Sequence, residues 1–235
     1  MTVPASVRAS IIVPVRNGQR FLAQALASIV GNASAVDELI VIDDGSTDGT
    51  AGILDAFLQD HACLCLRSDG VGPAAARNLG LEVAAGRFVA FLDHDDQWPA
   101  GRLDAHCQEL ERHDAAVIMG RTQYLIEDAA QASRFRFPDG QQAGHLHHLG
   151  ASTFRREVFA RHGRFDPALR FSEDQDFFLR LMDAGCDIHR VPEVGLLYRV
   201  HETNMTRGVP TRNLGLFQVL HASIQRRRAA GPRAV

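Results

Sequence analysis

The chain has 235 residues, of which 46% are apolar and 23% are charged. This length and composition allow one large buried core and favour a single α/β domain over two separate domains. The net charge of -3 excludes a general electrostatic attraction to nucleic acid or to anionic lipid, so any phosphate binding must be local.

The sequence gives no sign of export or of membrane insertion. The first ten residues lack the apolar core of a signal peptide, and no run approaches the roughly 20 apolar residues that span a bilayer. The four cysteines, at positions 63, 65, 107 and 186, have no C-x-x-C spacing, and we expect buried free thiols in a reducing compartment. We therefore predict a cytoplasmic location, either free or peripheral at the inner face of the membrane.

Short apolar runs alternate with amphipathic runs through the first 112 residues. The alternation predicts a parallel, doubly wound sheet with right-handed crossovers, in which ligands bind beyond the carboxyl ends of the strands. We expect strands at 10–15, 38–42, 63–66 and 87–92, and helices at 21–30, 53–58, 74–85 and 102–112.

Polar residues follow three of these predicted strands, at 16–17, 43–44 and 93–96. All three clusters would therefore occupy one edge of the sheet. The carboxylates of Asp93, Asp95 and Asp96 would repel one another, and a divalent cation with bound phosphates would relieve that repulsion. An acidic turn that caps the next helix is the alternative.

The alternation loosens after residue 115. The segment 131–148 is polar, and we expect a flexible loop or lid that becomes protected when a donor binds. Its histidines, His145, His147 and His148, have no regular ligand spacing, so we expect a solvated loop there. Further strands are expected at 117–126, 151–155, 188–191 and 194–200, and helices at 157–162, from Ser172 to Gly185 and from Leu214 onward.

Six short motifs occur in a fixed order along nearly the whole chain. They are Ile11 to Asn17, Val41 to Asp48, Gly72 to Gly80, Phe91 to Asp96, Glu173–Asp174 and Tyr198 to His201. In this order they resemble family 2 of the inverting, metal-dependent glycosyltransferases with the GT-A fold.

The resemblance implies a Rossmann-like, doubly wound and mostly parallel sheet with a smaller acceptor-side subregion. It implies one domain, with a donor-binding half at 1–114, an acceptor-binding and catalytic half at 115–210, and a C-terminal helix and tail at 211–235. The implied activity is transfer of one hexose-type sugar from a nucleotide-diphosphate sugar, preferably a UDP-sugar, to a hydroxyl acceptor. The acceptor would be a cell-surface polysaccharide, glycolipid or glycoconjugate, and the cofactor would be Mn²⁺ or Mg²⁺.

By this resemblance, one set of residues would surround the donor. Asp44 would accept a hydrogen bond from the base, and Arg77 would lie near the diphosphate. From local sequence alone, Asp44 also suits a turn and Arg77 also suits a solvent-facing helix position. The complete donor set is Pro14, Arg16, Asn17, Asp43, Asp44, Arg77 and Asp93.

The resemblance also assigns the metal and the base. Asp95 would bind the metal, with His201 near it or near the diphosphate. Asp174 would take the proton from the acceptor hydroxyl as that oxygen attacks C1 from the side opposite the diphosphate. Glu173 would support the base or bind the acceptor. From local sequence, a structural role for His201 and a plain acidic first helical turn at 173–174 stay open, and desolvation would be needed to make Asp174 a strong base.

Two acidic residues and two departures need separate treatment. We expect Asp48 to form an Asx-type turn or helix cap and Asp96 to cap a helix. Many relatives carry an aromatic residue immediately before Asn17, where this chain has Arg16. The guanidinium of Arg16 can stack on a base, but this departure weakens the prediction that the base is uracil. The short chain lacks a transmembrane channel and a second catalytic domain, which favours one sugar per encounter.

Other classes of protein compete with this interpretation. A non-catalytic nucleotide-binding scaffold of the same fold would not need Asp95, Asp174 and His201 together. A sugar nucleotidyltransferase usually begins with a glycine-rich basic loop, which is not present at 14–17. A nicotinamide-dependent dehydrogenase is excluded because no G-x-G-x-x-G follows the first strand. Only the arginines at 226–228 favour a nucleic-acid partner, and they suit a solvated helix end.

Overall fold

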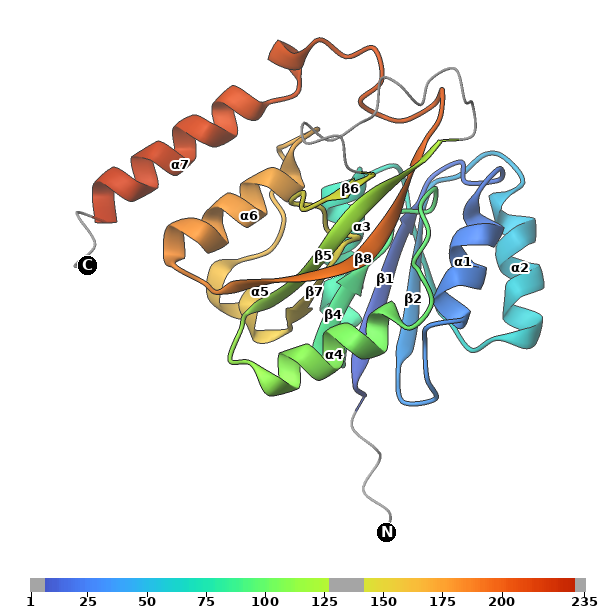
Figure 1. Cartoon of the computed structure of the whole chain (residues 1–235). Coiled ribbons are helices and arrows are strands. Elements are labelled where there is room, and N and C mark those ends of the chain that lie inside the picture. Colours follow the sequence, from blue (N-terminus) through green and yellow to red (C-terminus); the bar gives the residue numbers. More distant parts are fainter. Residues whose placement is uncertain (1–6, 127–141, 231–235) are drawn as a thin grey trace.

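The protein is built around a mixed β-sheet with helices on both faces (Figure 1). The structure is a computed structural model that describes residues 7–126 and 142–230. The strands are β1 (Ala9–Val15), β2 (Glu38–Asp44), β3 (Leu64–Ser68), β4 (Phe88–Phe91), β5 (Val117–Ile126), β6 (Ala143–Gly144), β7 (Ser152–Arg155) and β8 (Ile188–Val200). The helices are α1 (Leu22–Val30), α2 (Thr50–Asp60), α3 (Pro73–Val83), α4 (Arg102–Arg112), α5 (Glu157–His162), α6 (Glu173–Ala184) and α7 (Leu216–Ala230), with a 3₁₀ turn, η2 (Thr211–Asn213).

The strand order is β3-β2-β1-β4-β7-β5-β6, and β8 pairs with β5. Strands β1 to β4 are parallel, as predicted, so their carboxyl ends share one edge. Strand β7 runs antiparallel between β4 and β5, which joins the two halves of the chain in one sheet. The predicted α/β class with a mostly parallel sheet is confirmed.

Alternation along the central strand divides the core into two layers. Ile11 and Val13 of β1 pack with residues of α1, α2 and α4, whereas Ile12 between them packs with residues of α3, α5 and α6. The chain is buried throughout β1 because both faces of the sheet are covered. This rigid centre supports the loops at the carboxyl edge.

A glycine lets α3 approach the sheet closely. A Cβ atom at Gly80 would lie 2.5 Å from Cγ2 of Ile12 and 3.0 Å from Cδ1 of Ile42. Any larger residue would push the helix outward. The close packing therefore sets the position of Arg77, one turn earlier on α3.

Strand β8 differs from the prediction of two strands. It is continuous over thirteen residues, with irregular pairing to β5 near Arg121. At this point a Cβ atom at Gly120 would lie 2.8 Å from the Cα atom of Gly195. The backbones cross too closely for side chains, so the strand bends without ending, and the expected break at 192–193 was wrong.

Two smaller expectations also need correction. Cys65 is exposed because β3 is an edge strand, and Cys63 and Cys186 are only partly buried. Of the predicted lid, residues 131–141 lie outside the described residues. His147 and His148 pack against Phe178 and Tyr198, so a fully solvated setting was wrong for these two histidines.

Within the described ranges, no helix has both the length and the apolar character needed to cross a bilayer.

Candidate active site

The acidic turn after β4 presents two carboxylates and buries a third. The side chains of Asp93 and Asp95 are 45% and 19% exposed. Asp96 turns inward and accepts a hydrogen bond from the backbone N–H of Arg199, 2.8 Å away. Burial, with the charges of Asp95 and Asp93, raises the pKa of Asp96 well above its ordinary value. Helix α4 begins only at Arg102, so the prediction that Asp96 caps a helix was wrong.

Asp95 meets a histidine from the far end of the chain. Nε2 of His201, just beyond β8, lies 2.9 Å from Oδ2 of Asp95. Burial alone would raise the pKa of Asp95, but the hydrogen bond from His201 and the nearby charge of His94 lower it below its ordinary value. Nδ1 of His201 lies 2.9 Å from Oγ1 of Thr203. In this arrangement Nε2 carries the proton and donates to Asp95, while Nδ1 accepts from the backbone N–H of Thr203 and can accept from its hydroxyl.

The donor set of Asp95 and His201 fits a divalent cation. A carboxylate oxygen and an imidazole nitrogen lie 2.9 Å apart. Carboxylates suit Mg²⁺ and Mn²⁺, and imidazole is a common ligand of first-row transition metals. When Nε2 binds a cation, Nδ1 must hold the proton, and Oγ1 of Thr203 can accept it as a hydrogen bond. Phosphate oxygens and waters would complete the coordination, as Mg²⁺ and Mn²⁺ sites at nucleotides commonly allow.

A buried arginine connects the acidic turn to α6. Arg77 donates from Nη2 to Oδ1 of Asp93 and from Nη1 to Oε1 of Glu173, both over 2.6 Å. Burial alone would lower the pKa of Arg77, but the two carboxylates raise it. The solvent-facing alternative for Arg77 is therefore wrong. Nε of Arg77 is buried and has no hydrogen-bond partner among the described residues.

Asp174 lies at the first turn of α6, beside this ion pair network. Burial, together with the charge of Glu173, raises the pKa of Asp174 to about 7, while Arg77 opposes the shift. The desolvation that a strong base requires is therefore present. Ser172, immediately before this turn, has φ 63° and no capping hydrogen bond. A non-glycine residue in the left-handed region is strained, and such strain is typical of functional sites.

The loops after β1 and β2 interlock at the same edge. Asp44 is buried and accepts hydrogen bonds from Oγ of Ser68 and from the backbone N–H groups of Val71 and Gly72. Burial would raise the pKa of Asp44, but these three donors lower it. The carboxylate therefore organises the loop before α3.

The other predicted donor residues occupy the same edge in different ways. Arg16 is exposed and its guanidinium lies against Gly70, where a Cβ atom would be 2.8 Å from Nη1. Oδ1 of Asn17 accepts from the backbone of Thr47, and Asp43 accepts from that of Ser46. Pro14 is buried in β1, so only its main chain could contact a nucleotide.

Asp48 has the structural role that we predicted. Its Oδ1 accepts from the backbone and hydroxyl of Thr50, the first residue of α2, and its Oδ2 accepts from the backbone of Gln19.

Arg199 is a site residue to which the sequence analysis gave no role. Its Nε donates to the main-chain oxygen of Asp95 over 2.9 Å, and its guanidinium lies 4.7 Å from the ring centre of Phe21. The ring of Phe21 in turn packs 4.7 Å from that of His201. The position of Arg199 between Tyr198 and His201 was the available signal, but no spacing rule shows that an arginine folds back onto a distant turn.

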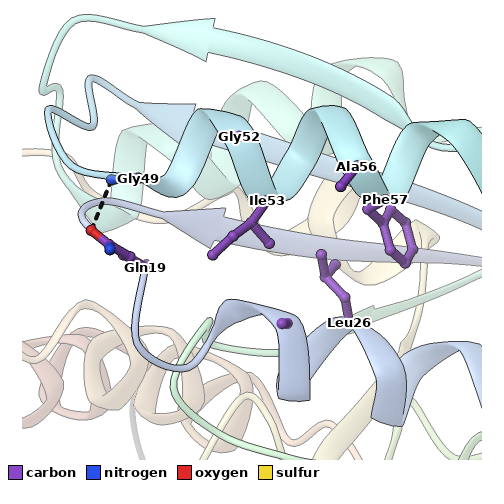
Figure 2. Close-up of a pocket in the computed structure, with 8 residues that line it drawn as sticks. Gln19, Leu26, Gly49, Gly52, Ile53, Ala56 and Phe57 are labelled. Carbon is purple, nitrogen blue, oxygen red and sulfur yellow. Dashed lines mark hydrogen bonds between the residues drawn. The ribbon is translucent and has the colours of Figure 1, made fainter.

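Two further features of the described residues lie apart from these carboxylates. Glu109, His113 and His189 form a surface group whose ligand atoms lie within 4.8 Å, at the ends of α4 and β8 far from the acidic turn. A groove of about 590 Å³ runs between α1 and α2 (Figure 2). Neither feature includes a residue of the Asp95–His201 pair or of α6.

A model of glycosyl transferase family 2 matches residues 10–171, more than half of the chain. The chain belongs to glycosyl transferase family 2. The matched region contains the acidic turn and both interlocked loops, while Asp174 and His201 lie beyond it.

Relatives in family 2 support the same assignment. One relative is the Escherichia coli UDP-Glc:alpha-D-GlcNAc-diphosphoundecaprenol beta-1,3-glucosyltransferase WfgD. The two sequences are 32% identical over 129 residues, and the aligned region covers 55% of this chain and 51% of WfgD. The matched region spans about half the length of some curated relatives and about a fifth of the length of others.

Solved structures share the GT-A fold of family 2. *Staphylococcus aureus* TarS in complex with UDP-GlcNAc has a TM-score of 0.76 at 19% identity, over 93% of this chain and 66% of that one. A mannosyltransferase from *Pyrobaculum calidifontis*, in complex with GDP-Man and Mn²⁺, has a TM-score of 0.65 at 20% identity, over 97% and 65%. The fold prediction is confirmed.

Proposed function

We propose that this family 2 protein is an inverting glycosyltransferase that moves one sugar from a nucleotide-diphosphate sugar to a hydroxyl acceptor. The observation that carries the proposal is Arg77, which binds Asp93 and Glu173 at once. Through these two ion pairs, Arg77 links the acidic turn to Glu173, the residue next to the candidate base Asp174. A carboxyl group whose pKa is raised to about 7 beside these ion pairs favours a catalytic role over that of a scaffold.

The chemistry assigned to Asp174 is general base catalysis. As the acceptor oxygen bonds to C1 of the sugar, its proton passes to the Asp174 carboxylate, and the bond from C1 to the diphosphate oxygen breaks with its electron pair. A single displacement inverts the anomeric centre. Glu173 supports the base by keeping Arg77 fixed, and Arg77 lies close enough to oppose the negative charge that gathers on the diphosphate.

The proposed donor pocket lies between the loops after β1, β2 and β3. Arg16 can stack its planar guanidinium on a base, and Asp44 can accept from an N–H edge after its loop adjusts. Asn17 and Asp43 maintain the loop geometry around them, and Asp93 would face the ribose. UDP is the preferred nucleotide, in keeping with the UDP-sugars named for WfgD and TarS.

Asp95 and His201 are proposed to hold Mn²⁺ or Mg²⁺. The bound cation would supply positive charge to stabilise the departing nucleoside diphosphate. Support comes from the facing ligand atoms and from the Mn²⁺ in the *P. calidifontis* neighbour.

The acceptor is proposed to be a hydroxyl of a cell-surface polysaccharide or glycolipid, as the name of WfgD suggests. In this proposal residues 1–114 bind the donor and residues 115–210 supply the base and acceptor wall. The protein would work on the cytoplasmic side of the membrane.

The decisive test is a thermal-unfolding screen of UDP-, GDP- and dTDP-sugars with and without Mn²⁺. A donor at about 100 times its dissociation constant should stabilise the protein by roughly 2.7 kcal/mol. We expect metal-dependent stabilisation by one UDP-sugar and release of UDP when an acceptor is added. Stabilisation without any turnover on an acceptor array would favour the scaffold, and release of pyrophosphate from a nucleoside triphosphate would favour the nucleotidyltransferase.

A further inference from the structure

Helix α7 is attached to the molecule by one face. Val219 and Ser223 are buried against α6, where Oγ of Ser223 donates to Asp183. Arg226 and Arg227 also donate to Asp183, over 2.9 and 2.7 Å. These contacts fix the rotation of α7 about its axis, and the helix lies along the outside of the molecule beside α6 (Figure 1).

A face beside the packed one carries an apolar stripe, which we call the α7 stripe. It consists of Phe217, Leu220 and Ile224, which are 71%, 49% and 47% exposed. Their spacing of three and four residues places them on one side of the helix. A phenylalanine exposed to this extent costs free energy in water unless another surface covers it.

Exposed arginines flank the α7 stripe in the sequence. Arg228 follows Ile224 by one helical turn and is exposed, as is Arg212 in η2 before the helix. Helix α7 contains no acidic residue and three arginines, of which Arg226 and Arg227 pair with Asp183 and Arg228 is exposed, although the whole chain has a net charge of -3. An apolar stripe with arginines at its end matches the interface of an anionic bilayer, where lipid phosphates meet acyl chains.

We propose that the α7 stripe docks this protein onto a membrane surface that contains anionic phospholipid. A second copy of the chain fits less well. Three side chains expose much less than the ~800 Å² per partner of a standard protein interface. The arginines would gain no opposite charge from the α7 of a twofold partner, because that helix has none to offer.

Docking through α7 would bring the acceptor side of the site to the lipid. Oγ of Ser172 donates to the main-chain oxygen of Leu214 over 2.7 Å, so the start of α7 is tied to the residue two before Asp174. A lipid-borne acceptor could then reach the base from the membrane plane. This consequence rests on the proposed glycosyltransferase function, whereas membrane binding itself does not.

The test is co-sedimentation of the full chain with vesicles of phosphatidylcholine, with or without phosphatidylglycerol. We expect binding to the phosphatidylglycerol vesicles, weakened at high salt, and little binding to phosphatidylcholine alone. The triple change Phe217→Ser, Leu220→Ser, Ile224→Ser should reduce binding at least about tenfold. Arg228→Glu should reduce it at least about fivefold, which corresponds to about 1 kcal/mol for one basic residue at an anionic surface.

A matched control removes two exposed apolar side chains elsewhere, Leu58→Ser with Val83→Ser, and should bind vesicles as the wild type does. Thermal unfolding and metal-dependent UDP binding verify that each variant is folded, and light scattering gives the mass in solution. Equal vesicle binding by the wild type and the triple variant would overturn the proposal. So would a wild-type dimer that becomes monomeric in the triple variant, because a second copy would then cover the stripe. If the triple variant loses vesicle binding but still binds UDP, the membrane proposal is supported independently of the proposed glycosyltransferase function.

Discussion

His201 Nε2 lies 2.9 Å from Asp95 Oδ2, although 106 residues separate the two in the chain. The pair joins the turn after β4 to the end of β8. Because Thr203 can satisfy Nδ1 in either tautomer, His201 can exchange its hydrogen bond to Asp95 for a bond to a cation without leaving a buried nitrogen unpaired.

Asp95→Asn should abolish the metal dependence of UDP binding, because an amide oxygen is a weak ligand in place of a carboxylate. His201→Ala should weaken the same binding by about 10- to 100-fold. Isothermal calorimetry of UDP in Mn²⁺ and in EDTA measures both effects. Asp187→Asn, at an exposed position, serves as the control. Equal UDP affinity of the wild type in Mn²⁺ and in EDTA would contradict the metal role.

Asp174→Asn should separate transfer from binding. The amide keeps the shape of the carboxyl group but cannot accept a proton, so the transfer rate should fall by about 10² to 10⁴. UDP affinity should change little, whereas Asp95→Asn should damage both binding and turnover. Rates on an identified acceptor, measured at saturating donor, give the comparison. Transfer at the wild-type rate by Asp174→Asn would place the base elsewhere.

Transfer should depend on pH through the same residue. With its pKa raised to about 7, Asp174 is mostly protonated at pH 6, and kcat should fall about tenfold for each pH unit below the pKa. Because folding raises the pKa of Asp174, its protonated carboxyl group stabilises the folded state at low pH. This contribution to the free energy of unfolding is lost as the pH rises through 7. Asp174→Asn should therefore unfold at an equal or higher temperature than the wild type at pH 8. A flat rate profile between pH 5.5 and about 8 would oppose this assignment.

Arg102→Lys tests a buried arginine that sets the wall beside β7. Its guanidinium donates to the main-chain oxygens of Gly150 and Ser152 and to Oγ1 of Thr153. A lysine cannot reproduce this fork, so the free energy of unfolding should fall by about 1–3 kcal/mol for the carbonyl groups left unpaired. Urea unfolding measures the change. Arg112→Lys, at an exposed position on the same helix, should have almost no effect.

Nucleotide choice should depend on Arg16. We expect UDP to compete better than GDP or dTDP for the donor site, and Arg16→Ala to weaken UDP binding about tenfold through loss of stacking on the base. Arg87→Ala, at an exposed position before β4, is the matched control. A preference for GDP or dTDP would leave the fold unchanged and replace the proposed donor.

Local patterns were sufficient for most elements because their causes are local. Helices α4 and α5 and strand β5 begin and end as predicted, since periodic apolar residues and nearby glycine or proline determine them. The reversal of β7 was not predictable, because parallel and antiparallel strands have similar short sequences. The site divides in the same way: the motifs indicated Asp93, Asp95 and Asp174, but only the folded chain shows Asp96 turned inward.

Strand β7 pairs with β4 on one side and with β5 on the other, so the strands that end near Asp93 and His201 belong to one hydrogen-bonded framework. Many two-domain enzymes assemble their reactive groups by hinge bending at each turnover. Here Arg77 already bridges the acidic turn and α6 through its ion pairs with Asp93 and Glu173. Changes of substrate preference should therefore come from exchange of edge loops, which can vary without altering the spacing of the reactive groups.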